Sequence, residues 1–425
     1  MFVISQYSVP MIKFEKFTLK NGLKFIVHND PSTTLVAFNI LYNVGARDEN
    51  SDKTGFAHLF EHLMFEGSIN IPSYDTPLQN AGGENNAFTT NDITNYYITL
   101  PKENIETAFW LESDRMLSLD LSEKKLEIQK NVVIEEFNQR YLNQPYGDAM
   151  LLLRPLAYKD HPYQWATIGK DISHIKNAKL EDVKDFFNQH YAPNNAIVCI
   201  AGNIRIEEIK LLAEKWFNPI LKKEISTRKL LKEPEQKEIR THTVERNVPF
   251  NAIYKAFHMS SKLEKEYYVT DLISDLLANG KSSRLYQNLV KTKKLFSEIN
   301  AFITGDIDPG LFIITGKLMD QITLEDAEHA INHELDQIVK GNISDYEIQK
   351  VKNKFESVYQ FGQLSSLNKA IDLSYHELLG DANRINLEIE KYRSVTKDEI
   401  QFVASKLFTM INASTLFYRS KKLMQ

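Results

Sequence analysis

The chain has 425 residues, 43% of them hydrophobic and 25% charged, which is enough for two to four packed domains. A formal net charge of −5 argues against nucleic-acid binding, and a single cysteine, Cys199, excludes an internal disulfide and any cysteine-rich zinc module. No apolar run approaches the ~18 residues of a membrane span. The N-terminus lacks the pattern of a signal peptide, so we expect a cytoplasmic protein, or a periplasmic one if the N-terminus was trimmed.

The first half of the chain predicts one sheet with helices around it. Residues 12–30 are typical of two short strands joined by an Asn-Gly turn, and residues 34–43 predict a mostly apolar strand. Residues 54–66 have helical spacing that stops at a glycine. The elements expected next are a strand–turn–strand unit at 86–101, helices at 103–118 and 123–142, a strand at 194–203 and a helix at 205–217.

A charged stretch at 221–240, whose only helix breaker is Pro234, is interpreted as a connection between two halves. The alternative is an exposed helix and loop within one domain. The order of elements then repeats: residues 251–258 resemble the first apolar strand, and the tetrapeptide EIQK occurs at 127–130 and 347–350. This repetition predicts an internal duplication. We expect an N-terminal half at 1–220, a linker at 221–240 and a structurally similar C-terminal half at 241–425.

The segment His58-Leu59-Phe60-Glu61-His62 carries the strongest chemical signal. Residues four apart on a helix differ by ~40° in direction, so both imidazoles project from one face and can reach one metal ion. Glu61 can approach a water on that metal without being a ligand itself. Zinc lowers the pKa of such a water toward ~7, and a nearby carboxylate can take the proton. H-x-x-E-H is the inverse of the H-E-x-x-H zinc peptidase motif.

A second histidine pair provides a comparison. His329 and His333 have the same spacing, but they lie in a polar segment with no acid between them, so we expect a solvated helix face. The 58–62 segment is instead flanked by apolar residues, which predicts burial. Burying two histidines and a glutamate is costly unless a partner such as a metal ion pairs them.

A catalytic zinc ion takes three protein ligands and keeps one position for water, so a third ligand is needed. The candidates are Glu135 and Glu136 in the apolar stretch VVIEEF. These two side chains point about 100° apart on a helix, so only one of them can face the metal. The spacing by itself leaves the choice open.

Several ordered blocks of the sequence resemble the M16 metallopeptidases, the family of pitrilysin, insulysin and mitochondrial processing peptidase. The blocks are GARDE at 45–49, TGFAHLFEHLMFEGS, GGENNAFTTNDITNYYITLP, NVVIEEFNQRYLNQPYG, and later HPY at 161–163 and YAPNNA at 191–196. The length resembles the short-chain branch, and the chain resembles its zinc-bearing subunit. We expect an α+β fold of two similar halves, each a mainly antiparallel sheet with helices packed on one face, and the zinc motif only in the first half.

The resemblance implies one Zn²⁺ per chain, held by His58, His62 and Glu136, with Glu61 as the catalytic base. Many members carry a glutamate seven residues before the glutamate ligand, where it supports the zinc site. Gln129 stands at that position here, which weakens the expectation for this supporting role.

The resemblance also implies a peptide substrate that is bound as an added strand along Asn86, Ala87 and Phe88. The expected function is therefore zinc-dependent endopeptidase action on extended peptides. Two alternatives are kept: a non-catalytic assembly subunit, like the core proteins of the respiratory bc1 complex, and a peptidase that removes targeting presequences.

One departure from the family concerns the partner. Active members use an arginine and a tyrosine from a zinc-free half-unit, and Val290 and Ser297 stand at those positions here. The resemblance therefore implies a heterodimer with a related chain that supplies the pair. The alternative is a homodimer in which Lys291 or Tyr286 substitutes.

Overall fold

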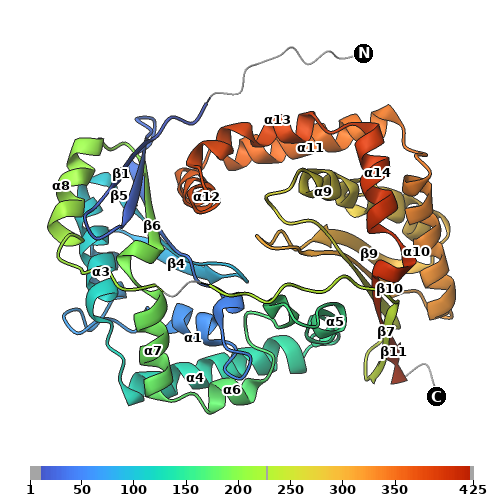
Figure 1. Cartoon of the computed structure of the whole chain (residues 1–425), viewed down its shortest axis with the longest axis horizontal. Helices are drawn as coiled ribbons and strands as arrows, with labels where there is room; N and C mark the ends of the chain where they lie inside the picture. Colours follow the sequence, from blue (N-terminus) through green and yellow to red (C-terminus); the bar gives the residue numbers. More distant parts are fainter. Residues whose placement is uncertain (1–10, 226–227, 422–425) are drawn as a thin grey trace.

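A computed structural model describes residues 11–225 and 228–421, and it contains two sheets, one in each half of the chain (Figure 1). The first sheet has the strand order β1-β2-β6-β3-β5-β4, and the second has the order β7-β11-β8-β10-β9. In both sheets one pair is parallel, β2 with β6 and β7 with β11, and the other neighbours are antiparallel. Apart from β1, which has no counterpart in the second sheet, the two halves therefore share one topology, and the predicted fold class is confirmed.

The strands predicted within 12–30, 34–43, 86–101, 194–203 and 251–258 are confirmed, and the second sheet contains four further strands that the sequence analysis did not predict. The first sheet consists of β1 (Glu15–Thr18), β2 (Lys24–Asn29), β3 (Leu35–Tyr42), β4 (Glu84–Thr89), β5 (Thr94–Pro101) and β6 (Ala196–Gly202). The second consists of β7 (Arg240–Arg246), β8 (Ala252–His258), β9 (Phe296–Ile303), β10 (Leu311–Leu318) and β11 (Ala413–Ser420). The hairpin predicted at 12–30 is confirmed as the antiparallel pair β1–β2.

The helices gather around the two sheets. In the first half they are α1 (Phe56–Leu63), α2 (Asp75–Asn80), α3 (Ile105–Ser118), α4 (Glu123–Phe137), α5 (Ala149–Ala157), α6 (Ile172–Lys176), α7 (Leu180–His190) and α8 (Ile206–Trp216). In the second half they are α9 (Lys265–Ala278), α10 (Leu324–Val339), α11 (Asp345–Gly362), α12 (Ser366–Leu378), α13 (Glu388–Arg393) and α14 (Lys397–Leu407). None of the helices in the described ranges is long and apolar enough to cross a membrane.

Two predicted helices differ in detail from the structure. The helix expected at 54–66 is shorter and forms α1, because the chain turns after Leu63. The helix expected at 123–142 divides into α4 and a π-helical turn at Asn138–Leu142. Helices α5, α6 and α7 lie in a segment for which the sequence analysis predicted no elements.

One helix from each half packs on the sheet of the other half. Helix α12 packs on β3 and β6 of the first sheet, where Leu373 is fully buried against residues such as Ile26 and Cys199. Helix α5 packs on β8 and β11 of the second sheet, where Leu153 is buried. The second face of each sheet is thus covered by a helix from the other half of the sequence, in addition to the main helical layer on the first face.

A buried polar cluster joins the turns of two hairpins, β4–β5 and β9–β10. Arg47 forms ion pairs with Asp92, at 2.8 Å, and with Asp308, at 3.0 Å. Tyr163 donates its hydroxyl hydrogen to Asp92 over 2.5 Å and accepts the backbone N–H of Asp308 at 3.1 Å. A buried arginine with two carboxylate partners fixes the junction of the two halves in one arrangement.

The segment interpreted as a linker has no helix or strand in its described residues before β7 begins at Arg240. It is held against the first half, because Arg228 donates to Asp48 and to the backbone carbonyl of Asn43. The division into 1–220, 221–240 and 241–425 stays a prediction, since α5 and α12 each pack across it.

Candidate metal centre

Helix α1 carries His58 and His62, and its apolar residues are buried. The apolar residues Leu59, Phe60 and Leu63 face the core of the first half. The imidazole rings of His58 and His62 lie on the other side of the helix with their centroids 4.9 Å apart. The predicted common face is therefore present, because a residue and its neighbour four positions on point in nearly the same direction.

Both ends of α1 are held by side chains from outside the helix. The two side-chain oxygens of Glu49 accept the backbone N–H groups of Gly55 and Ala57, each at 2.9 Å. Gly55 has φ of 90°, a left-handed conformation that favours glycine. At the other end, the Tyr96 hydroxyl donates to the carbonyl of Phe60 at 3.3 Å. Glu49 thus satisfies N–H groups that the start of a helix leaves unpaired, whereas Tyr96 adds a second donor to a carbonyl that already accepts the N–H of Met64.

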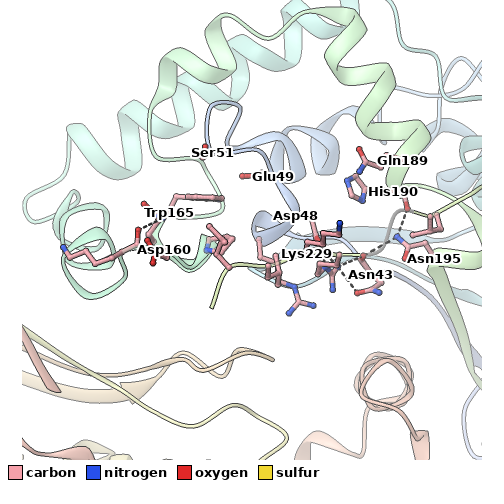
Figure 2. Close-up of a pocket in the computed structure, with 18 residues that line it drawn as sticks. Asn43, Asp48, Glu49, Ser51, Asp160, Trp165, Gln189, His190, Asn195 and Lys229 are labelled. Atoms are coloured by element: carbon pink, nitrogen blue, oxygen red, sulfur yellow. Dashed lines mark hydrogen bonds and ion pairs between the residues drawn. The ribbon is translucent and has the colours of Figure 1, made fainter. Parts of the chain in front are cut away.

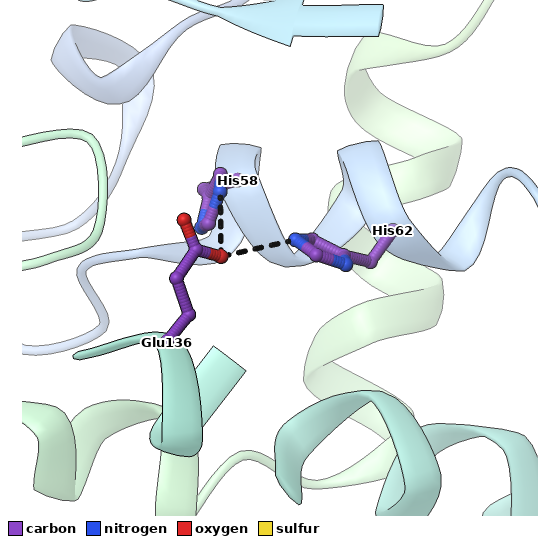
Figure 3. Close-up of side chains that lie close together, drawn as sticks. All are labelled: His58, His62 and Glu136. Atoms are coloured by element: carbon purple, nitrogen blue, oxygen red, sulfur yellow. Dashed lines mark ion pairs between the residues drawn. The ribbon is translucent and has the colours of Figure 1, made fainter. Parts of the chain in front are cut away.

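Glu136, on α4, completes a group of three possible metal ligands (Figure 3). Its Oε2 atom lies 3.5 Å from the Nε2 atoms of both His58 and His62. Two ligand atoms that are each ~2.1 Å from one tetrahedral zinc ion lie roughly 3.4 Å apart, so the spacing fits such an ion. In the described ranges this is the one group of histidine, cysteine and acidic side chains arranged in this way.

The protonation states also suit a cation. Burial lowers the pKa of His58 to about 4, which leaves its imidazole neutral and its nitrogen lone pair available. The hydrogen bond with His62 is the main cause that lowers the pKa of Glu136, and the charge of Arg140 acts in the same direction. One neutral imidazole and an ionised carboxylate are the forms in which these groups bind zinc.

Glu61 does not belong to this group of three, but it lies close enough to His62 and Glu136 for their charges to affect its pKa. Its Oε2 atom accepts a hydrogen bond of 2.6 Å from the hydroxyl of Thr89, the last residue of β4. Burial raises the pKa of the Glu61 carboxyl group, which makes it a stronger proton acceptor once it is ionised. The helix thus carries a possible base, and the neighbouring strand restrains it.

Glu135 and Gln129 both point elsewhere. Glu135 is exposed and accepts a hydrogen bond from Asn138, so packing of α4 on α1 turns Glu136 to the histidines. The amide of Gln129 donates to Glu66 and not to either histidine.

The Nδ1 atom of His58 is buried with no hydrogen-bond partner among the described residues. The support that many zinc sites give a histidine ligand is therefore missing at His58.

Asn86, Ala87 and Phe88 lie on β4, the edge strand of the first sheet. Strand β4 pairs on one side with β5 and has no strand on its other side among the described residues. The backbone N–H of Ala87, a residue in register with Tyr96 of β5, donates to the side-chain oxygen of Asn86 at 2.8 Å. A bound peptide strand would have to displace that side chain.

The positions that depart from the family lie in the second half. Val290 belongs to the π-helical turn Tyr286–Thr292 and packs on the core of that half. Ser297 lies on the edge strand β9, and its hydroxyl donates to the carbonyl of Lys317 at 3.2 Å. Lys291 is exposed and Tyr286 is half-buried on the same turn.

The solvated helix face expected for the second histidine pair is confirmed, and two other side chains also lie outside the candidate site. Cys199 is a buried thiol in β6, and burial raises its pKa. His329 and His333 are both exposed on α10. Arg284 forms an ion pair with Glu347 at 2.7 Å.

Arg140 is a residue of the site that the sequence analysis missed. Its Nη1 atom lies 2.8 Å from Oε1 of Glu136. The available signal was the i, i+4 spacing of a glutamate and an arginine on a predicted helix.

A cavity of about 590 Å³ lies elsewhere in the first half (Figure 2). Asp48, Glu49 and His190 line it, and Lys229 of the linker segment contributes to its wall. His58, His62 and Glu136 do not line this cavity. The metal centre and the cavity are therefore separate features.

Comparison with known proteins identifies relatives of both halves. The family description "Insulinase (Peptidase family M16)" matches residues 24–167, and "Peptidase M16 inactive domain" matches residues 177–355. The zinc protease PqqE of Helicobacter pylori is 29% identical over 413 residues, which cover 96% of this chain and 93% of that protein. The mitochondrial-processing peptidase subunit beta of Saccharomyces cerevisiae is 25% identical over 404 residues, covering 90% and 86% respectively.

A solved structure agrees with these matches. The crystal structure of a protease from Helicobacter pylori has a TM-score of 0.92 to this chain at 29% sequence identity. The likeness covers 96% of this chain and 100% of that one. Matches to both halves, in the same order and over nearly the whole length, identify the family: the chain belongs to the M16 peptidases.

Proposed function

We propose that this chain is a zinc-dependent endopeptidase that hydrolyses peptide bonds in extended peptides. The observation that carries the proposal is the convergence of His58 Nε2, His62 Nε2 and Glu136 Oε2 within 4.8 Å of one another, next to the carboxylate of Glu61. A zinc ion held by these three atoms would supply Lewis acidity, polarising a peptide carbonyl and lowering the pKa of water toward ~7. Relatives named as zinc proteases support this choice of metal.

Glu61 is the residue that moves the proton. Because Thr89 donates to its Oε2 atom, its Oε1 atom is left to accept a proton from the attacking water. The same carboxyl group can then deliver that proton to the amine that leaves. Thr89 keeps the carboxylate in one orientation and links it to the strand that would hold the substrate.

Strand β4 is the proposed site for the peptide. Its free edge would add the substrate as a further strand, so that main-chain hydrogen bonds provide affinity with little sequence selectivity. Thr89 closes β4 and contacts Glu61, so a peptide on Asn86, Ala87 and Phe88 would lie beside the base.

The test of this proposal is the metal content of a ligand variant. His58→Ala should remove most of the bound zinc and leave the fold intact, because two of three ligands do not hold the ion tightly. Zinc is measured by elemental analysis after gel filtration, and folding by circular dichroism. His329→Ala serves as the matched control, since it removes an exposed histidine from a pair with the same spacing. Equal zinc in His58→Ala and wild type would refute the site.

We further propose that the active form contains a related chain. Val290 and Ser297 cannot supply the cationic and phenolic groups that hold the substrate opposite the metal in active family members. One relative of this chain is named as a subunit of a processing peptidase, which favours a two-chain enzyme. A homodimer using Lys291 or Tyr286 is the alternative. A chain that binds zinc but stays inactive with every partner would favour a non-catalytic assembly role.

A further inference from the structure

We propose that Arg140 is a positioning residue for the metal ligand Glu136, an inference that rests on the proposed zinc site. The two carboxylate oxygens of Glu136 have different partners in the structure. Oε2 faces the two histidines at 3.5 Å, and Oε1 forms an ion pair of 2.8 Å with Nη1 of Arg140. The guanidinium group therefore holds the oxygen that does not face the ligand nitrogens.

The local structure explains how Arg140 reaches Glu136. Helix α4 continues at Asn138 into a π-helical turn that ends at Leu142, and Arg140 lies in that turn. Arg140 and Glu136 are four residues apart, a spacing that brings a glutamate and a following arginine together on a helix. Turns of this kind occur frequently at functional sites.

The environment shows why the carboxylate needs an external restraint. Glu136 is largely buried, with 18% of its side chain exposed, and its other close polar partners are the two histidines. Gln129 bonds to Glu66, and the Nδ1 atom of His58 has no partner among the described residues. Of the three ligands, Glu136 is thus the one held by a charged side chain from outside the group. A residue that orients a ligand in this way commonly improves metal affinity by roughly 10–100-fold.

Two opposing effects of Arg140 must be compared. A cation near the site repels a metal ion, but the Arg140 side chain is 69% exposed, so solvent and salt screen that repulsion. The hydrogen-bonded ion pair restricts the rotation of Glu136 directly, and this effect does not depend on long-range charge. Orientation should therefore outweigh repulsion, and removing Arg140 should weaken zinc binding.

The experiment compares zinc affinity in Arg140→Gln, Arg140→Lys and wild type by competition with a fluorescent chelator. We expect the zinc dissociation constant of Arg140→Gln to rise 10–100-fold. Arg140→Lys should lie between the two, because lysine keeps the charge but loses the planar fork of donors. Arg246→Gln is the control. It breaks an ion pair of 2.9 Å between Arg246 and Asp148, and the side chain of Arg246 is 43% exposed. Its zinc affinity should equal that of wild type.

A spectroscopic measurement adds a readout that general destabilisation would not change. In the Co²⁺-substituted protein, the visible absorption of Arg140→Gln should differ in position or intensity from wild type, because the geometry of the carboxylate ligand changes. Unchanged or tighter zinc binding in Arg140→Gln, together with an unchanged Co²⁺ spectrum, would overturn the role of Arg140 and leave the zinc site standing. Absence of zinc binding by the wild-type chain would overturn both the site and this inference.

Discussion

The carboxylate of Glu61 and the imidazole of His58 have pKa values shifted in opposite directions by one cause. Burial disfavours the charged form of each group, so the pKa of Glu61 rises and that of His58 falls to about 4. Glu61 becomes a stronger base and His58 a neutral donor of a lone pair. Both shifts thus arise on a single helix whose apolar residues belong to the core of the first half.

Glu61→Gln separates the base from the ligands. The variant should bind zinc like wild type, because Glu61 is not one of the three ligand atoms. It should lose ~10²–10⁴-fold in turnover, since an amide cannot accept the proton. Zinc content and cleavage of a quenched fluorescent peptide, measured with any partner that activity needs, test both statements. Retention of more than about a tenth of wild-type turnover would exclude Glu61 as the general base.

At the scale of elements, helix α1 depends on contacts from outside its own sequence. It spans only Phe56–Leu63, and helices of this length are marginal on their own. The side-chain oxygens of Glu49 accept N–H groups at its start, from Gly55 and Ala57. The positions of His58 and His62, the proposed metal ligands, therefore depend on a residue that lies outside the proposed site.

Glu49 should give the protein a defined dependence of stability on pH. Burial raises the pKa of Glu49 from 4.5 to about 8, so the folded state binds the proton more tightly than the unfolded state does. The stability that this group contributes is then fully present below pH 4.5 and is lost as the pH rises to about 8. The unfolding free energy of wild type minus that of Glu49→Gln should fall over this range.

The measurement is urea denaturation of both proteins at pH 5.5, 7 and 8.5, with zinc present throughout. Other titrating groups are common to the two proteins and cancel in the difference. A difference that stays constant or increases with pH would show that Glu49 is ionised in the folded protein.

At the scale of the whole molecule, the exchange of α5 and α12 joins the two halves. Each sheet would expose an apolar face if the other half were removed. The buried contacts of Arg47 with Asp92 and Asp308 join the halves at a second place. The proposed metal centre therefore lies in a half whose sheet is covered on one face by a helix of the other half.

Leu373→Ala tests this coupling. Leu373 lies on α12 in the second half of the sequence but packs on the first sheet, where it is fully buried. The substitution should lower the unfolding free energy by about 2–5 kcal/mol. Hydrogen exchange should increase in β3 and β6, which α12 covers. Leu364→Ala, at an exposed position after α11, should have little effect. A small loss of stability with unchanged exchange in β3 and β6 would show that α12 contributes little to the first half.

The proposed partner leads to a prediction about activity. This chain alone should hydrolyse peptides weakly or not at all, because losing one stabilising donor costs ~10²–10³-fold in turnover. Addition of a related M16 chain that carries the arginine and tyrosine should restore activity and saturate at one partner per chain. The measurement is a titration of one purified chain into the other with a fluorescent peptide substrate. Full activity of this chain alone, unchanged by the partner, would favour the homodimer.

The sequence by itself determined the features that depend on local geometry. A spacing of four residues on a helix places His58 and His62 on one face, and alternation of apolar residues identifies most strands. The blocks shared with the M16 peptidases determined the fold class as well as the family, because their order follows the order of elements along the chain.

Only the tertiary structure decided which side chains meet across long distances in the sequence. Geometry can choose between Glu135 and Glu136 only if the rotation of α4 about its axis relative to α1 is known. No local sequence pattern contains that information. The same holds for two other contacts between distant segments: Gln129 bonds to Glu66, and α12 covers the first sheet. Periodicity shows which face of an element is buried, whereas the partner of that face depends on packing between segments that are distant along the chain.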